Sequence, residues 1–276
     1  MIWFHLSRRL SKIISRCSGS QTFMEYIRLG KTNLLVSKVA FGAMRLAEDV
    51  GEENAAEIVR KAYDAGINLF DTSRKTPESE KLLGDALYDI RKNIFLSTTT
   101  DSVTTEKIIS DLENSLMTLH TDSVDLFQFE TDDFLPASCS GEQIYETLQH
   151  LKDEGKIKHF GILTTNFETA KKAVESDLYE TLQFPFSMIS PTEVIELVKL
   201  CEAHDVGFIA MQPLCGGVVE NIPLAFGFLY QFENVIPIWG MESMAEMEQI
   251  LYFNEHPPVI DEQFQKDVEH ARMFFN

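Results

Sequence analysis

Short apolar runs alternate with longer segments of helical period along most of the chain. The longer segments carry apolar residues every three or four positions, as in Ile108, Leu112, Leu116 and Leu119. This alternation is typical of parallel strands joined by crossover helices. The pattern predicts eight strands, at residues 38–41, 68–70, 94–97, 123–129, 157–162, 181–184, 207–211 and 235–238.

Eight strand–helix units without an intervening linker predict an α/β fold of the (β/α)8 TIM-barrel type, formed by residues 24–276 as a single domain. Residues 26–36 read as a β-hairpin that could plug the bottom of the barrel. After the eighth unit, Pro257 and Pro258 break the chain, and residues 261–275 predict one further amphipathic helix.

Several helix starts are marked by capping boxes, in which a hydroxyl and an acid or amide three residues later satisfy each other's free backbone donors. These boxes occur at 140–143, 165–168, 190–193 and 243–246, and Pro191 is expected at the first position of its helix. Thr76 followed by Pro77 predicts another helix start.

Residues 1–23 differ from the rest of the chain, because they hold four basic residues, five serines and no acid. Three interpretations stay open: an extension that is disordered or arises from an upstream start, an organelle-targeting peptide, or a membrane-surface segment. We leave this segment out of the fold prediction.

Composition narrows the function classes. The chain is 44% hydrophobic and carries a net charge of −19, with 24 basic and 43 acidic residues. No stretch is long and apolar enough to cross a membrane, and the negative charge argues against nucleic acid as a partner. The four cysteines form no CxxC pair and have no metal-ligand spacing, which favours reduced thiols in the cytoplasm and no metal site.

The carboxyl ends of barrel strands are where function is expected. At these positions the sequence resembles the aldo-keto reductase family, over about 24–252, in a series of short strings in the family's order. The strings are 26–30, 41–44, 66–72, 79–84, 124–128, 155–158, 161–162, Gln183 and 213–214. The resemblance implies a barrel that passes hydride from NADP(H) to a carbonyl, with an Asp, Tyr, Lys and His tetrad.

Carried over position by position, the tetrad is incomplete. Asp71 fills the Asp position, whereas the Tyr position is Thr76, the Lys position is Thr99 and the His position is Glu130. Threonine cannot replace tyrosine as an acid, since its hydroxyl pKa lies far above tyrosine's value of about 10. Arg74 and Lys75 could place a cation near Asp71, but a solvated loop pair is the more usual interpretation of adjacent basic residues.

The residues implied to bind the cofactor are Gln183, Met211, Gly240 and Ser243, yet their surroundings are altered. Leu163 replaces a nicotinamide-binding serine, and Glu246 stands where the family places a basic residue. No Lys or Arg occurs between Lys199 and Lys266. We therefore expect NADP(H), implied by the resemblance alone, to bind weakly or not at all. An apolar top or interior is suggested by Phe184, Phe186, Met188, Phe208 and Trp239.

Two functions follow from these observations. The first is a barrel that has lost NADPH-dependent carbonyl reduction and acts as a non-catalytic binding or structural module for an unknown small molecule or protein. The second is a divergent NAD(P)H-dependent oxidoreductase that reduces an aldehyde, ketone or activated double bond with Asp71 and Glu130. Cys215, in the loop after the seventh strand, reads as an inert buried thiol.

Overall fold

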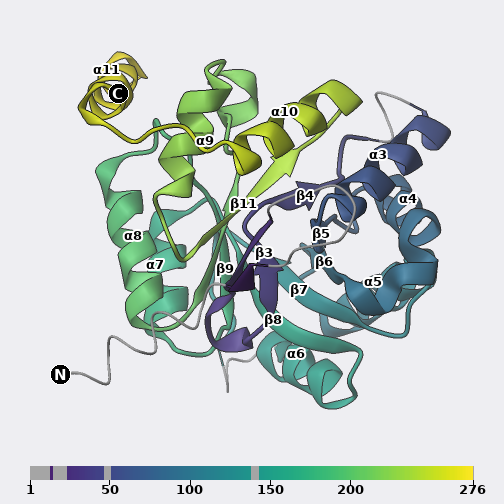
Figure 1. Ribbon diagram of the computed structural model, residues 1–276. Helices are drawn as coiled ribbons and strands as arrows, with labels where there is room; N and C mark the ends of the chain where they lie inside the picture. Colours follow the sequence, from purple (N-terminus) through teal and green to yellow (C-terminus); the bar gives the residue numbers. More distant parts are fainter. Residues whose placement is uncertain (1–12, 15–23, 47–50, 138–142, 276) are drawn as a thin grey trace.

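A closed parallel barrel forms the body of the protein in the computed structural model (Figure 1). The structure describes residues 13–14, 24–46, 51–137 and 143–275. Within them, eight strands close in the order β10-β11-β4-β5-β6-β7-β8-β9. They are β4 (Ala40–Gly42), β5 (Leu69–Asp71), β6 (Phe95–Thr100), β7 (Val124–Glu130), β8 (Ile157–Leu163), β9 (Thr181–Pro185), β10 (Gly207–Met211) and β11 (Val235–Gly240).

Helices follow the strands and cover the outside of the barrel (Figure 1). Their bounds are α3 (Glu52–Asp64), α4 (Pro77–Leu87), α5 (Thr105–Thr118), α6 (Ile144–Asp153), α7 (Phe167–Glu175), α8 (Thr192–Ala203), α9 (Ile222–Tyr230) and α10 (Met244–Glu255). Short 3-10 helices, η2 (Tyr88–Asn93) and η3 (Cys215–Gly217), follow α4 and β10. All eight predicted strands are present, so the TIM-barrel prediction is confirmed.

The predicted hairpin closes the bottom of the barrel. It comprises β2 (Glu25–Arg28), the 3-10 helix η1 (Gly30–Thr32) and β3 (Leu35–Ser37), with β2 and β3 antiparallel. Ile27, Leu29 and Val36 of this hairpin are buried against side chains inside the barrel. A Cβ on Gly30, at φ +49°, would lie 2.2 Å from the backbone nitrogen of Gly207, so only glycine permits this approach.

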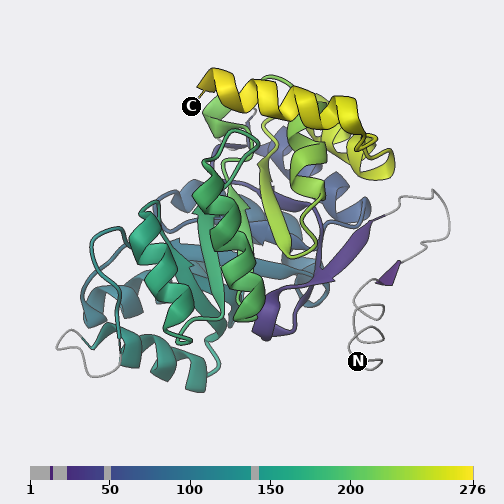
Figure 2. The ribbon, with the colours of Figure 1, turned by 90° about the vertical axis from the view of Figure 1, so that its left-hand side faces the viewer.

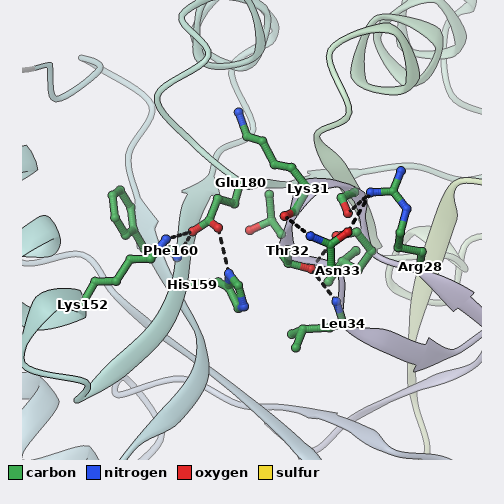
Figure 3. Close-up of polar contacts among 12 residues, drawn as sticks. Arg28, Lys31, Thr32, Asn33, Leu34, Lys152, His159, Phe160 and Glu180 are labelled. Atoms are coloured by element: carbon green, nitrogen blue, oxygen red, sulfur yellow. Dashed lines mark hydrogen bonds and ion pairs between the residues drawn. The ribbon is translucent and has the colours of Figure 1, made fainter.

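Charged side chains form ion pairs on the hairpin side of the barrel (Figure 3). Glu180, just before β9, lies 2.6 Å from Lys152 Nζ and 2.8 Å from His159 Nδ1. Burial raises the pKa of Glu180, but His159 and Lys152 outweigh it and hold the pKa below its usual value. Arg28 of the hairpin pairs with Asp205, at the start of the β10 unit, at 2.5 Å.

The segments before and after the barrel in the chain follow the prediction in part. The C-terminal helix α11 (Glu262–Phe275) packs beside α9 through Phe264 and Val268 (Figure 2). Ile13–Ile14 form β1, which pairs antiparallel with β2. The remaining residues of 1–23 lie outside the described part of the chain, and the predicted boundary at residue 24 stays a prediction.

The predicted N-terminal residues are confirmed for α10 and α4 and are wrong for α7 and α8. Ser243 caps α10 through Glu246 N, and Thr76 and Pro77 begin α4, although the Thr76 side chain makes no capping hydrogen bond. In α7 the cap is Asn166 rather than Thr165, and Pro191 is the residue before α8 rather than its first. Ser140 lies outside the described residues. Asn166 is the N-cap of α7 because its side chain accepts from both Glu168 N and Thr169 N. These backbone donors are then no longer free to bond with Thr165.

Candidate functional site

Residues at the carboxyl end of β5 face the inside of the barrel beside neighbouring strands. Asp71 pairs in register with Gly42 of β4 on one side and with Ser97 of β6 on the other, and Gly42 pairs with Gly240 of β11. Side chains two residues apart on a strand share one face, and Ala40, Leu69 and Ile238 belong to the interior core. Gly42, Asp71 and Gly240 therefore point inward at one level of the barrel.

Asp71 is the central acidic group of this interior. It is 3% exposed, and its Oδ2 accepts a hydrogen bond of 3.4 Å from Gln183 Nε2, across from β9. Burial raises the pKa of Asp71 to about 7, against the opposing influence of Ser97 and Gln183. Ser97 acts without a hydrogen bond of normal geometry, since its Oγ and Asp71 Oδ1 both lack a partner within the described part of the chain.

A second polar pair lies in the neighbouring strands. Gln128 of β7 and Thr181 of β9 are hydrogen-bonded through their side chains at 3.1 Å, and both are buried. Gly161 of β8 lies between them, where a Cβ would come within 2.0 Å of Thr181 Oγ1. The barrel interior therefore has a polar middle layer above its apolar bottom.

Glu130 ends β7 and forms an ion pair at the rim of the barrel. Its Oε2 lies 2.8 Å from Lys75 Nζ, and Lys75 Nζ lies 3.1 Å from Asp101 Oδ2. Partial burial lowers the pKa of Lys75, but the hydrogen bonds and charges of Glu130 and Asp101 raise it further, so the net pKa lies above its usual value. Lys75 is therefore charged and held by two carboxylates.

The two threonines at the Tyr and Lys positions have different surroundings. Thr76 Oγ1 donates to the backbone oxygen of Ser73 at 3.3 Å, in the turn that leads into α4. Thr99 is 2% exposed on β6 and pairs in register with Gln128, which places its side chain on the inner face of the barrel. The structure thus puts Thr99 inside the barrel and uses Thr76 at a helix start.

Arg74 and Lys75 have separate partners, which corrects the prediction of a solvated loop pair. Arg74 Nη1 lies 2.5 Å from Glu80 Oε2, and Glu80 is completely buried. Glu80 also accepts a hydrogen bond of 2.8 Å from Thr98, which points to the outer face of β6. Burial raises the pKa of Glu80, against the influence of its hydrogen-bond partners and Arg74. Lys75 therefore contacts carboxylates at the rim of the barrel, whereas Arg74 contacts the buried carboxylate of Glu80 on α4.

The four residues implied to bind a cofactor lie at three neighbouring strand ends. Gln183 is buried inside, Met211 is half-buried at the end of β10, and Gly240 is exposed at the end of β11. Ser243 is already used, because its Oγ accepts from Glu246 N at 3.2 Å. Glu246 in turn accepts from Glu242 N at 2.8 Å, so a carboxylate lies at the N-terminus of α10.

These residues fit a dinucleotide phosphate poorly. A helix N-terminus binds an anion through its backbone N–H groups, and at α10 one such group, Glu246 N, already donates to Ser243 Oγ. Glu242 N, just before the helix, donates to the Glu246 carboxylate. Arg45, from the loop after β4, brings a cation to this end, but it lies 3.3 Å from Glu242 and is 67% exposed. Sequence reasoning missed Arg45, because nothing near it in the chain indicates which loop it faces.

The barrel interior has an apolar bottom, formed by residues such as Leu69, Ile209 and Ile236, but the aromatic residues predicted at the apolar top or interior do not form it. Phe208 and Trp239 alternate with Ile209 and Ile238, whose side chains fill the inside, so they point outward. Trp239 stacks on Phe226 of α9 with ring centres 5.6 Å apart. Trp239 thus packs the barrel wall against α9, while Ser97, Gln128 and Thr181 make the middle layer of the interior polar.

Ser97, Gln128 and Thr181 were missed by sequence reasoning, although a signal was present. Polar residues recur two positions apart, in Ser97 and Thr99 and again in Thr181 and Gln183. That period places both members of a pair on the same face of a strand. Cys215 was predicted to be buried, but it is half-buried, with its Sγ 3.1 Å from Ser187 Oγ.

The described residues show neither a cluster of metal ligands nor a membrane-spanning helix. No group of three or more His, Cys, Asp or Glu side chains that could hold a metal ion occurs among them. Across the same part of the chain, no helix has the length and apolar character needed to cross a membrane.

Comparisons with known proteins agree with the geometry. Among curated proteins, the chain is 26% identical over 211 residues to the uncharacterized oxidoreductase YqkF of Bacillus subtilis, covering 71% of this chain and 67% of that protein. It is 28% identical over 218 residues to L-galactose dehydrogenase of Arabidopsis thaliana, covering 72% and 68%. Across six such relatives, the match spans 64–68% of their length.

A solved structure shows the same fold. An aldo-keto reductase of Klebsiella pneumoniae, in complex with NADPH, superposes with a TM-score of 0.77 at 17% identity, covering 90% of this chain and 94% of that one. The sequence model of the Aldo/keto reductase family matches residues 38–222, from the start of the barrel to the beginning of α9. With the closed barrel and the strand-end residues described above, this match shows that the chain belongs to the aldo/keto reductase family.

Proposed function

We propose that this barrel has lost the NADPH-dependent carbonyl reduction of its family and acts as a non-catalytic binding module. The observation that carries the proposal is the state of Asp71. The carboxyl group faces the neutral side chains of Gln183 and Ser97, which oppose only in part the rise in its pKa caused by burial. Lys75, the cation at the rim, is held by Glu130 and Asp101.

The distribution of tyrosines supports the proposal. All seven are described, and none lies on a barrel strand. Tyr26 donates to Gly66 O in the hairpin region, and Tyr179 donates to Pro136 O. Burial raises the pKa of Tyr230 to about 12, which makes it a weaker acid than free tyrosine. None of these groups is placed to protonate a carbonyl inside the barrel.

The cofactor end supports the same proposal. NADP(H) would supply hydride if it were bound, and Gln183 could contact its nicotinamide amide. At the phosphate end, however, the carboxylate of Glu246 lies at the start of α10, where it accepts from Glu242 N. A like charge beside a phosphate weakens binding, and because Glu246 is exposed, solvent limits this effect to about 1 kcal/mol. We therefore expect NADP(H) to bind weakly or not at all.

A titration with NADPH tests this function. Trp239 is the next-to-last residue of β11, so a nicotinamide bound at the carboxyl end of the barrel should quench its fluorescence through energy transfer. We expect no saturable quenching at micromolar NADPH and no NADPH oxidation with a panel of aldehydes, ketones and activated alkenes. Micromolar quenching together with substrate-dependent oxidation would overturn the proposal.

One observation favours the divergent oxidoreductase as a second candidate. Glu130 is one-third exposed at the rim beside a cation, and Asp71 inside has a pKa near neutrality, which suits a proton donor. If Glu130 and Asp71 perform catalysis, Glu130→Gln should abolish a measurable reductase activity. An unchanged rate in that variant would remove Glu130 from the reaction.

A further inference from the structure

We propose that the interior of the barrel at Asp71 binds the primary ammonium group of a small organic amine, through Asp71, Ser97 and Gln183. This inference rests on the proposed binding function and names the class of ligand that the same interior would take. It depends on which buried oxygens lack partners, on the room beside them and on the charge of the chain.

Three buried side-chain oxygens in one cluster lack hydrogen-bond partners within the described residues. They are Asp71 Oδ1, Ser97 Oγ and Gln183 Oε1, on side chains that are 3%, 1% and 3% exposed. Asp71 and Gln183 are hydrogen-bonded to each other, and Ser97 lies next to Asp71 in the register of β5 and β6. An unpartnered buried polar atom costs about 1–3 kcal/mol, so such a cluster calls for a ligand or bound water.

The chemistry of the cluster points to a donor of several N–H groups. Gln183 uses its Nε2 to donate to Asp71, which leaves its carbonyl oxygen as an acceptor. Asp71 supplies a second acceptor, and the hydroxyl of Ser97 can supply a third. A primary ammonium group carries three donors and one positive charge. It therefore satisfies the three oxygens and compensates the one carboxylate.

Room for the ligand lies on the β4 and β11 side of Asp71. Gly42 pairs in register with Asp71, and Gly240 pairs with Gly42, so neither neighbouring strand places a side chain on the inner face at this level. A Cβ at Gly240 would meet no atom within 4 Å, whereas one at Gly42 would lie 2.8 Å from Ile238 Cγ2. Open space therefore lies at Gly240, toward the rim, whereas Ile238 occupies the position beside Gly42. The ammonium group would enter from the Gly240 side.

Apolar side chains near the rim suit a short alkyl chain on the amine. Leu163 pairs in register with Gln183, and half-buried Met211 ends the neighbouring strand β10. The acidic body of the chain attracts a cation, because residues 24–276 carry 20 basic and 43 acidic residues. A metal ion fits less well, since Asp71 is the single carboxylate of the cluster and hard cations prefer several.

Binding should depend on pH in a defined direction. The groups that face Asp71 are Ser97 from β6, Gln183 from β9 and the glycines of β4 and β11, and none of these titrates. The ammonium ion binds the ionised carboxylate, so a proton leaves Asp71 as the ligand enters. With a carboxyl pKa of about 7, the ionised fraction rises about tenfold between pH 6 and pH 8. Affinity for an alkylammonium ion should rise by the same factor.

Calorimetric titration with n-butylammonium chloride at constant ionic strength tests the proposal, without any cofactor. We expect saturable binding at pH 8, about tenfold weaker at pH 6, and no binding of 1-butanol or of butyltrimethylammonium, which lacks N–H donors. Asp71→Asn should lose at least about tenfold in affinity. Asp133→Asn makes the same change at an exposed aspartate and should bind as the parent protein does.

Four results would overturn the ammonium site: no saturable binding, equal binding by Asp71→Asn, equal binding of 1-butanol, or displacement of butylammonium by equimolar potassium, which would indicate a metal-ion site. The side-chain amide signals of Gln183, followed by NMR, locate the bound ligand independently of affinity. NADPH turnover would overturn the non-catalytic function and leave the amine result standing, so the two failures are distinguishable.

Discussion

Lys75 Nζ lies 2.8 Å from Glu130 Oε2, although the two residues are 55 positions apart in the chain. The loop after β5 carries the lysine across β6 to the end of β7, where Asp101 also contacts it at 3.1 Å. A cation is therefore present at the rim of the barrel, but it is paired with rim carboxylates. Burial raises the pKa of Asp71 inside the barrel to about 7, and the opposing influence of Ser97 and Gln183 does not outweigh it.

The Lys75–Glu130 pair should contribute little to stability. Both side chains are partly exposed, at 41% and 33%, so solvent screens their attraction. A double-mutant cycle with Lys75→Met and Glu130→Gln, measured by urea unfolding, should give a coupling free energy of about 0–1 kcal/mol. A coupling well above that range would show that the pair is more tightly held than its exposure indicates.

Asp71 should make the protein less stable as pH rises. The folded pKa of about 7 lies above the unfolded value of about 3.9, so the folded state binds more protons between these values. The contribution is fully favourable below about pH 4 and is lost as pH rises through 7, up to about 4 kcal/mol.

Asp71→Asn should therefore remove this pH dependence and stabilise the protein at pH 8 relative to pH 5. Urea unfolding at several pH values measures the difference, with Asp133→Asn as the exposed control. Equal slopes of stability against pH in Asp71→Asn and the parent protein would contradict the raised pKa.

Gly161→Ala should destabilise the barrel, because the new Cβ would lie 2.4 Å from the backbone oxygen of Thr181 and 2.5 Å from Gln128 Oε1. Overpacking of this kind costs about 1–3 kcal/mol. Gly240→Ala is the matched control, since its Cβ would meet no atom within 4 Å, and it should stay within about 0.5 kcal/mol of the parent protein. Thermal unfolding of both variants distinguishes a packed interior at β8 from open space at β11.

Glu246→Lys should favour binding of NADPH over NADH. The substitution removes the carboxylate that accepts from Glu242 N and places a cation at the start of α10. We expect the ratio of NADPH to NADH affinity, measured by calorimetry, to rise by about tenfold or more. Glu248→Lys adds the same charge on an exposed position of the same helix and should change the ratio less.

Arg74→Ala should be costly, because it leaves the completely buried Glu80 without its ion partner. Removing one member of a buried pair costs about 3–5 kcal/mol, whereas replacing both members can be close to neutral. We expect Arg74→Ala with Glu80→Met to recover most of the stability lost in Arg74→Ala, as measured by urea unfolding. A double variant no more stable than Arg74→Ala would mean that the pair is not the cause of the loss.

Much of the architecture could be predicted from local sequence. The period of apolar residues predicts the eight strands and their helices, and the hairpin before β4 follows from turn residues between two short apolar runs. The identity of residues at the strand ends follows too, since Asp71 and Glu130 are the last residues of β5 and β7. These features depend on residues near one another in the chain.

The partners of those residues could not be predicted in the same way. Gln183 reaches Asp71 across 112 positions, and Lys75 passes over β6 to reach Glu130. The aromatic residues Phe208 and Trp239 were expected at the top or in the interior of the barrel, but the register of β10 and β11 turns them outward. A shift of one residue moves every side chain of a strand to the other face, so small differences in register decide what the interior contains.

Local sequence is enough to predict the barrel, its hairpin and the replacement of the family's Tyr and Lys positions by Thr76 and Thr99. The tertiary arrangement sets a polar layer above the apolar bottom of the interior and pairs Lys75 with carboxylates at the rim. It leaves Asp71 without an ion-pair partner among the residues that the structure describes. The reason is physical: helical and strand periods are local properties of the chain. Hydrogen bonds and ion pairs inside a closed barrel depend on how strands far apart in sequence align.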